Sequence, residues 1–122
     1  MEIFTVPAGR RVKFTARSQP AAHPTHRWNV VVHPHGAAAT TAPLLAYGSE
    51  IEPGEDQRVE APEQDVACDW RVEASHRRSN WWAPDGAVRA PDEAGRRSIS
   101  FNRGESTPSG ECVLEFAFFA EA

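Results

Sequence analysis

The sequence has no long hydrophobic run, and its longest apolar segment, residues 116–120, is only as long as a β-strand. A membrane-spanning helix needs about 20 apolar residues, so the sequence predicts a soluble protein without a membrane span. The first residues also lack the basic start, the apolar stretch and the small-residue cleavage site of a secretory signal peptide. We therefore expect a cytoplasmic location.

Lysine is nearly absent, with one residue against twelve arginines, and only two cysteines are present. The excess of arginine, alanine and proline is typical of a GC-rich bacterial source. Cys68 and Cys112 both fall on the apolar side of predicted strands, which places both thiols in the core. A bridge between them would close a loop of about 44 residues and stabilise the fold by roughly 4 kcal/mol. Because the cytosol keeps thiols reduced, we expect two free, buried cysteines.

Neither sign of charge dominates the chain, whose formal net charge is −4. The charges are unevenly spread: residues 1–29 carry five basic groups and one acidic group, whereas residues 50–65 carry seven acidic groups and one basic group. Residues 70–103 carry seven basic and four acidic groups. This local excess of positive charge is too small to predict binding to a phosphate backbone, so no nucleic-acid partner is expected.

Several motifs that mark enzymes are missing. The chain has no Gly-X-Ser-X-Gly nucleophile motif, no phosphate-binding or dinucleotide-binding glycine loop, and no dedicated calcium loop. Neither cysteine lies outside the apolar phase, where a catalytic thiol would be expected. We therefore assign no catalytic residue and no cofactor, and an enzyme is the less favoured function.

A period of two is the strongest feature that the sequence does contain. Residues 66–74 place an apolar side chain at every second position, among them Cys68 and Trp70. This pattern is typical of a half-buried antiparallel strand, and it returns in residues 12–16, 28–32 and 112–118. The sequence thus predicts an all-β, single-domain antiparallel β-sandwich of about seven to nine short strands over residues 1–122. A jelly roll and a small barrel are the alternatives.

Turns rich in proline and glycine separate the predicted strands. The strands are expected at residues 2–6, 11–17, 27–33, 57–61, 66–75, 80–83, 87–90, 96–103 and 111–120. Residues 18–26 and 104–110 are predicted to be loops. Residues 37–50 show no clear period and are also predicted to form a loop, which leads into a turn at residues 51–56.

The loop 76–89 is the best candidate for a binding site, with residues 84–86 expected to form a hairpin tip between the short strands 80–83 and 87–90. It contains Arg77, Arg78, Asn80, Trp81 and Trp82. Adjacent side chains on an extended segment point to opposite faces, so only one of the two indoles can join the core. An exposed indole beside arginine and asparagine is suited to packing on a sugar ring while its neighbours bind hydroxyl groups. The sequence favours a non-catalytic, lectin-like binding module for a carbohydrate or another small polar ligand.

A structural or assembly protein is the second hypothesis. Val113, Ala117 and Phe119 fall on the outward phase of the last predicted strand, which is therefore apolar on both faces. A sheet with two apolar faces is often covered by another chain. This pattern predicts a homo-oligomer.

A small metal-dependent enzyme is the third hypothesis. His33 and His35 are two residues apart, which places both imidazoles on one face of an extended segment, with His23, His26 and His76 as further candidates. Imidazoles at this spacing can bind zinc, but a site needs a third ligand and supporting hydrogen bonds. One sequence shows neither, so no metal ligand is assigned.

Overall fold

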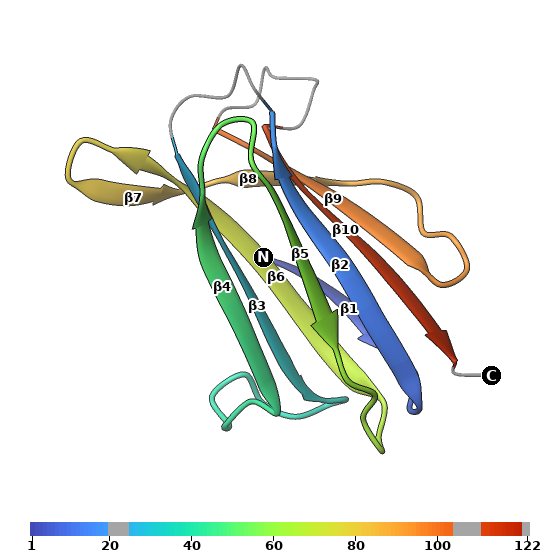
Figure 1. Ribbon diagram of the computed structural model, residues 1–122. Helices are drawn as coiled ribbons and strands as arrows, with labels where there is room; N and C mark the ends of the chain where they lie inside the picture. Colours follow the sequence, from blue (N-terminus) through green and yellow to red (C-terminus); the bar gives the residue numbers. More distant parts are fainter. Residues whose placement is uncertain (20–24, 104–110, 121–122) are drawn as a thin grey trace.

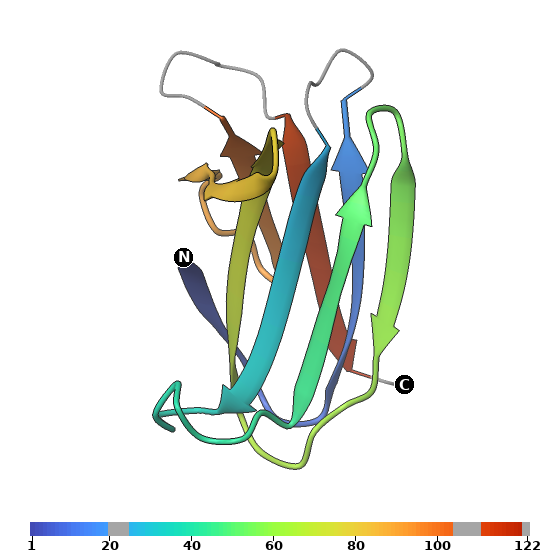
Figure 2. The same ribbon diagram turned by 90° about the vertical axis from the view of Figure 1, so that its left-hand side faces the viewer.

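The structure is a computed structural model that describes residues 1–19, 25–103 and 111–120, which form two antiparallel sheets packed face to face (Figures 1 and 2). The described residues contain ten strands: β1 (Glu2–Val6), β2 (Arg10–Ser18), β3 (His26–Pro34), β4 (Leu45–Ile51), β5 (Asp56–Ala61), β6 (Cys68–Arg78), β7 (Trp81–Pro84), β8 (Gly86–Arg89), β9 (Arg96–Asn102) and β10 (Cys112–Ala120). The predicted all-β sandwich is confirmed. None of these residues belongs to a helix long and apolar enough to cross a membrane.

The strand order separates two layers. The first sheet has the order β1-β6-β3-β4, and β7 also pairs with β6. The second sheet has the order β5-β2-β10-β9-β8. Every pairing between these strands is antiparallel and stays within one sheet, so the described residues form an open sandwich rather than a closed barrel. The chain passes from the first sheet to the second between β1 and β2, between β4 and β5, and between β7 and β8.

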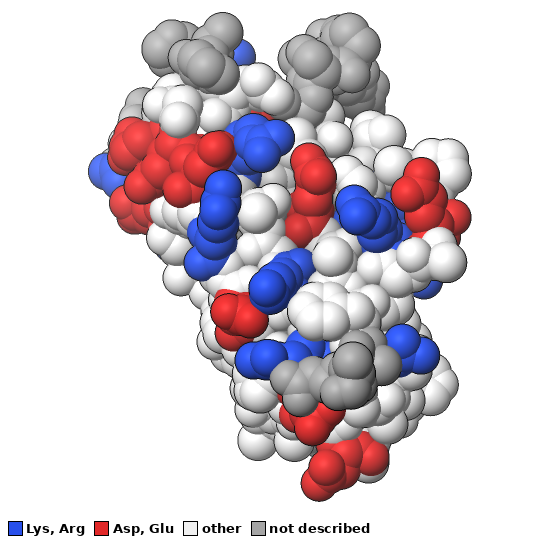
Figure 3. All heavy atoms as spheres, turned by 45° about the vertical axis from the view of Figure 1, so that its right-hand side comes forward, with Lys and Arg blue, Asp and Glu red and all other residues white. Residues whose placement is uncertain are grey.

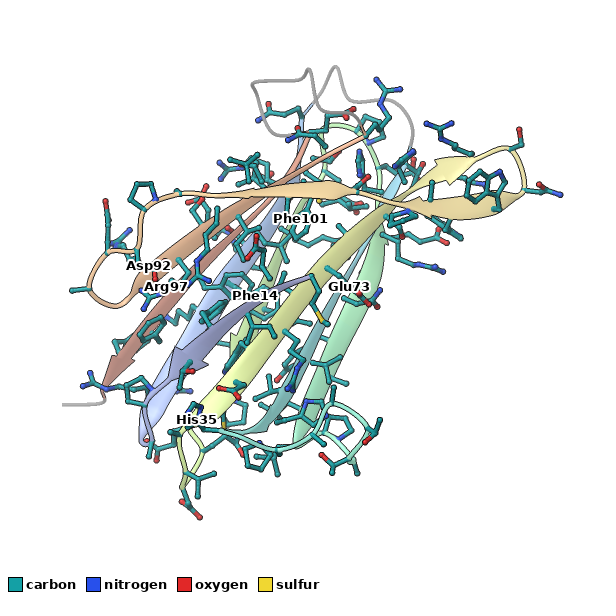
Figure 4. The ribbon with its side chains drawn as sticks, turned by 180° about the vertical axis from the view of Figure 1, so that it is seen from behind. Phe14, His35, Glu73, Asp92, Arg97 and Phe101 are labelled. Atoms are coloured by element: carbon teal, nitrogen blue, oxygen red, sulfur yellow. The ribbon has the colours of Figure 1, made fainter. Side chains whose placement is uncertain are left out.

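Apolar side chains at every second position meet between the two layers. Phe14 and Phe101 lie in this interior (Figure 4), where each is 1% exposed. The ring centroid of Phe14 is 5.0 Å from that of Phe116, 5.5 Å from that of Trp28 and 6.1 Å from that of Trp70. Rings at such distances add to the free energy of apolar burial, so this cluster forms the centre of the core.

Strand β4 corrects the sequence analysis, which predicted a loop over residues 37–50 and a turn from Ile51. Only residues 35–44 connect β3 to β4, and Ile51 is the fully buried last residue of β4. Tyr47 packs against the core, but Gly48 and Ser49 weaken the apolar alternation. Glycine is uncommon inside strands. Here Gly48 leaves room for Asn29, because a Cβ atom at residue 48 would lie 2.6 Å from the Asn29 Oδ1 atom.

Other boundaries differ by a few residues. The long strand predicted at 66–75 begins at Cys68 and continues to Arg78, because β7 pairs with its second half. The strand predicted from residue 27 begins at His26, inside the predicted loop 18–26. The remainder of that loop, at residues 20–24, and the predicted loop at 104–110 lie outside the described residues.

The two cysteines are free and buried, as predicted. They lie at opposite ends of the sandwich: Cys68 pairs with Val6 at the end of β1, whereas Cys112 pairs with Ser18 at the end of β2. Burial, followed by the negative charges of Asp85 and Glu111, raises the pKa of Cys112 to about 12. This thiol is therefore protonated at neutral pH and is unsuited to act as a nucleophile.

The uneven charges of the sequence are brought together by strand pairing. β2 carries basic residues and β5 carries acidic ones, and the two strands are neighbours. Arg17 lies 3.2 Å from Asp56, and Lys13 lies 3.8 Å from Glu60. Basic and acidic side chains are therefore interspersed over the outer face of the second sheet (Figure 3). Such exposed pairs contribute little to stability but leave little uncompensated charge.

Candidate functional site

Strands β6 and β7 form a hairpin that projects from one end of the sandwich (Figure 1). Ser79 and Asn80 make the turn, and Ser79 has a positive φ of 49°. The predicted hairpin tip at 84–86 is wrong, because β7 pairs with β6 in the first sheet whereas β8 pairs with β9 in the second, and most of the predicted loop 76–89 is strand. Arg78 pairs with Trp81, and Arg77 pairs with Trp82. Paired residues of an antiparallel ladder lie on the same face, so each tryptophan has one arginine beside it.

The two tryptophans lie on opposite faces of this hairpin, and neither joins the core. Trp81 has the inward phase, but the hairpin extends past the second sheet and leaves Trp81 54% exposed. Trp82 lies half-buried on the outer face of the first sheet. The expectation that one indole could be buried among core residues is therefore wrong, because only a sheet lying opposite the hairpin would have enclosed it.

Trp82 is held between two arginines from different strands. The guanidinium carbon of Arg27, on β3, lies 4.5 Å from the indole centroid, and that of Arg77 lies 5.8 Å from it. Both distances are within the range of cation–π attraction. The sequence analysis missed Arg27, because it is 55 positions from Trp82 in the chain and only the β3–β6–β7 pairing brings it close.

A shallow hollow of about 200 Å³ lies beside Trp82 on the first sheet. It is lined by Arg27, Asn29, Glu73, Ala74, Ser75, Trp82 and Pro84. We call these residues, together with Arg77 beside the Trp82 ring, the Trp82 face. A second hollow of about 150 Å³ shares Asn29 and Glu73 with the first, so the two follow β3 and β6 in line. Glu73 is exposed on the outer side of β6, away from the interior that contains Phe14 (Figure 4). The face thus combines an indole with hydrogen-bond donors and acceptors on a rigid sheet.

The predicted site residues are only partly brought together. Trp82 and Arg77 lie at the Trp82 face, whereas Trp81 and Arg78 are on the opposite side of the hairpin. Arg78 donates a hydrogen bond from Nε to Nε2 of His76 at 3.0 Å. Asn80 lies in the exposed turn. A single ligand therefore cannot use both tryptophans as walls of one pocket.

Two larger hollows, of about 360 and 460 Å³, lie on the outer face of the second sheet and share Lys13 and Thr15. Several of their charged side chains are already paired, since Lys13 contacts Glu60 and Glu115 contacts Arg17. Neither offers an exposed aromatic platform. They are therefore weaker candidates for a ligand site than the Trp82 face.

The apolar side chains expected to drive assembly also lie on the second sheet. Val113 and Ala117 are half-buried, and Phe119 is 38% exposed. The ammonium group of Lys13 lies 5.7 Å from the Phe119 ring centroid. The apolar residues are thus flanked by charged ones, and self-association through this face stays a prediction.

A buried polar cluster anchors the hairpin where the chain changes sheets. Asp85 follows β7, and its side chain is fully buried. Its carboxylate accepts hydrogen bonds from Nδ1 of His26 at 2.8 Å and Nδ1 of His76 at 2.6 Å. The backbone N–H of Asp85 also donates to the carbonyl oxygen of Ala74. These bonds connect β3, β6 and the β7–β8 connection, and so hold the base of the hairpin.

The buried cluster of Asp85, His26 and His76 supports the base of the hairpin and is closed off from solvent. Nε2 of His26 has no hydrogen-bond partner among the described residues and lies 4.0 Å from Oε2 of Glu111. Glu111 is itself engaged by the backbone N–H and the Nε of Arg103, at 2.8 and 2.9 Å. The side chains of His26 and Asp85 have no exposed surface, so a ligand cannot contact them in this arrangement.

His33 and His35 lie at the other end of the first sheet and do not form the expected pair. His33 is buried: its Nδ1 accepts a hydrogen bond from Arg71 at 2.8 Å, and its Nε2 donates to the carbonyl oxygen of Thr41 at 3.0 Å. Both ring nitrogens of His33 therefore already form hydrogen bonds, and the positive charge of the Arg71 guanidinium would repel a metal cation. His23 lies outside the described residues, and the part of the chain that is described holds no group of three or more metal-binding side chains.

Asp69 fastens the loop after β3 to β6. Its carboxylate accepts hydrogen bonds from Nδ1 of His35 at 2.7 Å, the hydroxyl of Thr5 at 2.8 Å and the backbone N–H of Gly36 at 3.1 Å. Burial alone would raise the pKa of Asp69. These hydrogen bonds and the attraction of His35 outweigh it and lower the pKa to about 2. The arrangement is structural: it holds a loop in place through an ionised carboxylate.

We predict that the ionised Asp69 carboxylate stops stabilising the folded state only in strong acid. The pKa of Asp69 is lower in the folded chain than the ordinary 3.8, so its stabilisation is fully present above pH 3.8 and is lost as the pH falls toward about 2. Asp69→Asn should destabilise the protein at pH 7 by about 1–2 kcal/mol, a value reduced for partial solvent screening. Urea unfolding between pH 7 and pH 2 measures the difference, which should vanish at the acidic end. A difference that stays constant with pH would contradict the assignment.

Comparison with known proteins adds no candidate function. No protein-family model matches the chain, and no curated protein sequence shows significant similarity to it. A function has to be inferred from the chain's own residues. Among the surfaces described above, the Trp82 face is the one where an aromatic wall, unpaired polar groups and a hollow occur together.

Proposed function

We propose that the protein is a non-catalytic, lectin-like binding module that recognises a carbohydrate or another small polar ligand at the Trp82 face. One observation carries the proposal: the hollow of about 200 Å³ in which the Trp82 indole stands beside Arg27, Asn29 and Glu73. The β6–β7 hairpin, which lies at the predicted recognition region 76–89, provides Trp82 and Arg77. The first sheet provides the remaining contacts.

The chemistry of a sugar matches this set of side chains. The C–H groups of a sugar ring pack against an indole, and its hydroxyls need donors and acceptors at fixed positions. Asn29 supplies both, Glu73 supplies an acceptor and Ser75 supplies a hydroxyl. The second hollow continues along the sheet past Asn29 and Glu73, which favours an extended oligosaccharide over a compact ligand.

Rigid strands support such a site better than a free loop. Asn29 lies on β3 and Glu73 on β6, and these are the two central strands of the first sheet. The buried Asp85 cluster fixes the base of the hairpin that carries Trp82. A single small hollow gives weak affinity, so we propose that homo-oligomerisation strengthens binding to multivalent glycans.

The adjacent tryptophans provide a matched pair of variants. Trp82→Ala should weaken binding of an oligosaccharide by about tenfold, because it removes the apolar wall and the support for Arg27. Trp81→Ala should leave affinity unchanged, because Trp81 is on the other side of the hairpin. A glycan array identifies the ligand, and isothermal titration calorimetry then compares the three proteins. Circular dichroism confirms that both variants fold.

Two results would overturn the proposal. If the wild-type protein binds no glycan on a broad array at high concentration, carbohydrate recognition is wrong. If Trp81→Ala weakens binding as much as Trp82→Ala, the ligand does not occupy the Trp82 face.

A further inference from the structure

Two positive charges share one indole on the Trp82 face. Arg27 and Arg77 lie 4.5 and 5.8 Å from the Trp82 centroid, so both guanidinium groups border the same ring. The indole attracts each of them by a cation–π contact, and their like charges repel. Among the described residues, no carboxylate lies within the 4.0 Å of an ion pair from either one. The two guanidinium groups are therefore without a directly paired carboxylate in the described part of the chain.

Within the described ranges, the guanidinium group of Arg27 has fewer polar partners than those of Arg71, Arg89 and Arg97, which are also half-buried. Arg71 donates to His33 and to a backbone carbonyl, Arg89 donates twice to Asp92, and Arg97 donates to two backbone carbonyls. The Nε atom of Arg27 is buried and has no hydrogen-bond partner among the described residues. The Nε of Arg97 shares this state, but it lies 3.4 Å from the Asp92 carboxylate, whereas Arg27 has no such ion pair in the part of the chain that the structure describes. A donor left in this state costs free energy unless a ligand satisfies it.

The carboxylates that lie nearest to Arg27 in the sheet do not pair with its guanidinium group. Glu50 is the partner of Arg27 in the β3–β4 ladder, and Glu73 lines the same hollow, yet neither forms an ion pair with Arg27. A guanidinium binds a carboxylate through two parallel hydrogen bonds, which requires an anion that can approach it freely. No carboxylate among the described residues supplies that anion, and a carboxylate on the ligand would.

We infer that the ligand of the Trp82 face is an acidic carbohydrate, with Arg27 and Arg77 binding its carboxylate and Asn29 and Glu73 binding its hydroxyls. This inference rests on the proposed function, which it narrows to a ligand class. An oligosaccharide of uronic acid residues has both kinds of group on every ring. Its rings also repeat at intervals that suit two hollows in line along a sheet.

The test compares charged and neutral forms of the same ligand. Oligosaccharides of galacturonic, glucuronic, mannuronic and guluronic acid are titrated by calorimetry, each beside its carboxyl-reduced neutral counterpart. For at least one acid, the charged form should bind about tenfold more tightly than the neutral form. This preference should decrease as the salt concentration rises, because exposed charges are screened.

Variants identify the arginines responsible. Arg27→Gln should lose the preference for the charged form, and Arg77→Gln, an exposed position whose change leaves the fold intact, should reduce it. Arg27→Lys keeps the charge without the paired hydrogen bonds and should retain only part of the preference. Arg58→Gln removes the same charge from the outer face of the second sheet and should have no effect.

The outcomes separate this inference from the proposed function. If neutral and charged forms bind equally, in a way that depends on Trp82 and not on Arg27 or Arg77, the acidic class is wrong and the binding module stands. If neither form of any oligosaccharide tested here or on the glycan array binds, both are overturned. If the charged form binds better and Arg58→Gln removes the preference as fully as Arg27→Gln, the attraction comes from basic side chains in general rather than from Arg27 and Arg77, and the assignment to Arg27 fails.

Discussion

Asp85→Ala is expected to lower the free energy of unfolding by about 3–5 kcal/mol, one of the two largest effects of any single substitution in this protein. The Asp85 carboxylate is fully buried and accepts hydrogen bonds from both His26 and His76. Alanine would leave two buried N–H donors without a partner, each costing its full desolvation. Urea unfolding followed by tryptophan fluorescence measures the change.

A surface aspartate provides the control. Asp56 pairs with Arg17, and both side chains are more than half exposed, so Asp56→Ala should cost less than about 1 kcal/mol. Asp85→Asn should cost less than Asp85→Ala, since the amide oxygen still accepts one of the two hydrogen bonds. Equal effects of Asp56→Ala and Asp85→Ala would show that the buried cluster does not hold the fold together.

Asp85→Ala also tests how the hairpin is positioned. The Asp85 hydrogen bonds connect β3 to the connection that follows β7, so their loss should loosen the hairpin before the sheets separate. Hydrogen exchange should then increase first at residues 75–84. If exchange rises evenly over both sheets, the cluster supports the sandwich as a whole rather than the hairpin that carries Trp82.

Phe14→Ala is the second large effect, with an expected loss of about 3–5 kcal/mol. Phe14 is 1% exposed, and the rings of Trp28, Tyr47, Trp70 and Phe116 surround it at centroid distances of 5.0–6.1 Å. These rings belong to both sheets, so they cannot close the cavity without moving the layers together. Thermal and urea unfolding both report the loss.

An exposed phenylalanine tests whether burial is the cause. Phe119 is 38% exposed on the outer face of the second sheet, so Phe119→Ala should change the free energy of unfolding by less than about 1 kcal/mol. Phe14→Leu should recover part of the loss, because it fills some of the cavity. If Phe14→Ala and Phe119→Ala cost the same, the aromatic cluster is not the centre of stability.

Strand prediction succeeded where the alternation was complete. Residues 68–74 and 112–118 place apolar side chains at every second position, and both are strands with the predicted faces buried. The prediction failed at β4, where Gly48 and Ser49 interrupt the pattern. That strand exists because pairing with β3 satisfies its backbone hydrogen bonds, and this long-range contact leaves no local signal.

The candidate site was predicted in part. The sequence predicted the opposite orientation of Trp81 and Trp82, since adjacent side chains of a strand always point to opposite faces. It placed the hairpin turn at residues 84–86, whereas the turn lies at Ser79 and Asn80 and β7 pairs back with β6. It did not show which indole would be half-buried. That depended on where the second sheet ends relative to the hairpin, which is a property of the packed layers.

The sequence by itself determined the all-β class, the inward faces of most strands and the burial of both thiols. These follow from local periodicity and turn residues, which act over a few positions. The tertiary structure alone decided that Arg27, Asn29 and Glu73 join Trp82, and that Asp85 meets His26 and His76. It also placed the basic strand β2 beside the acidic strand β5. Each of these contacts joins residues on different strands, and strand order is set by the packing of two layers rather than by any short segment.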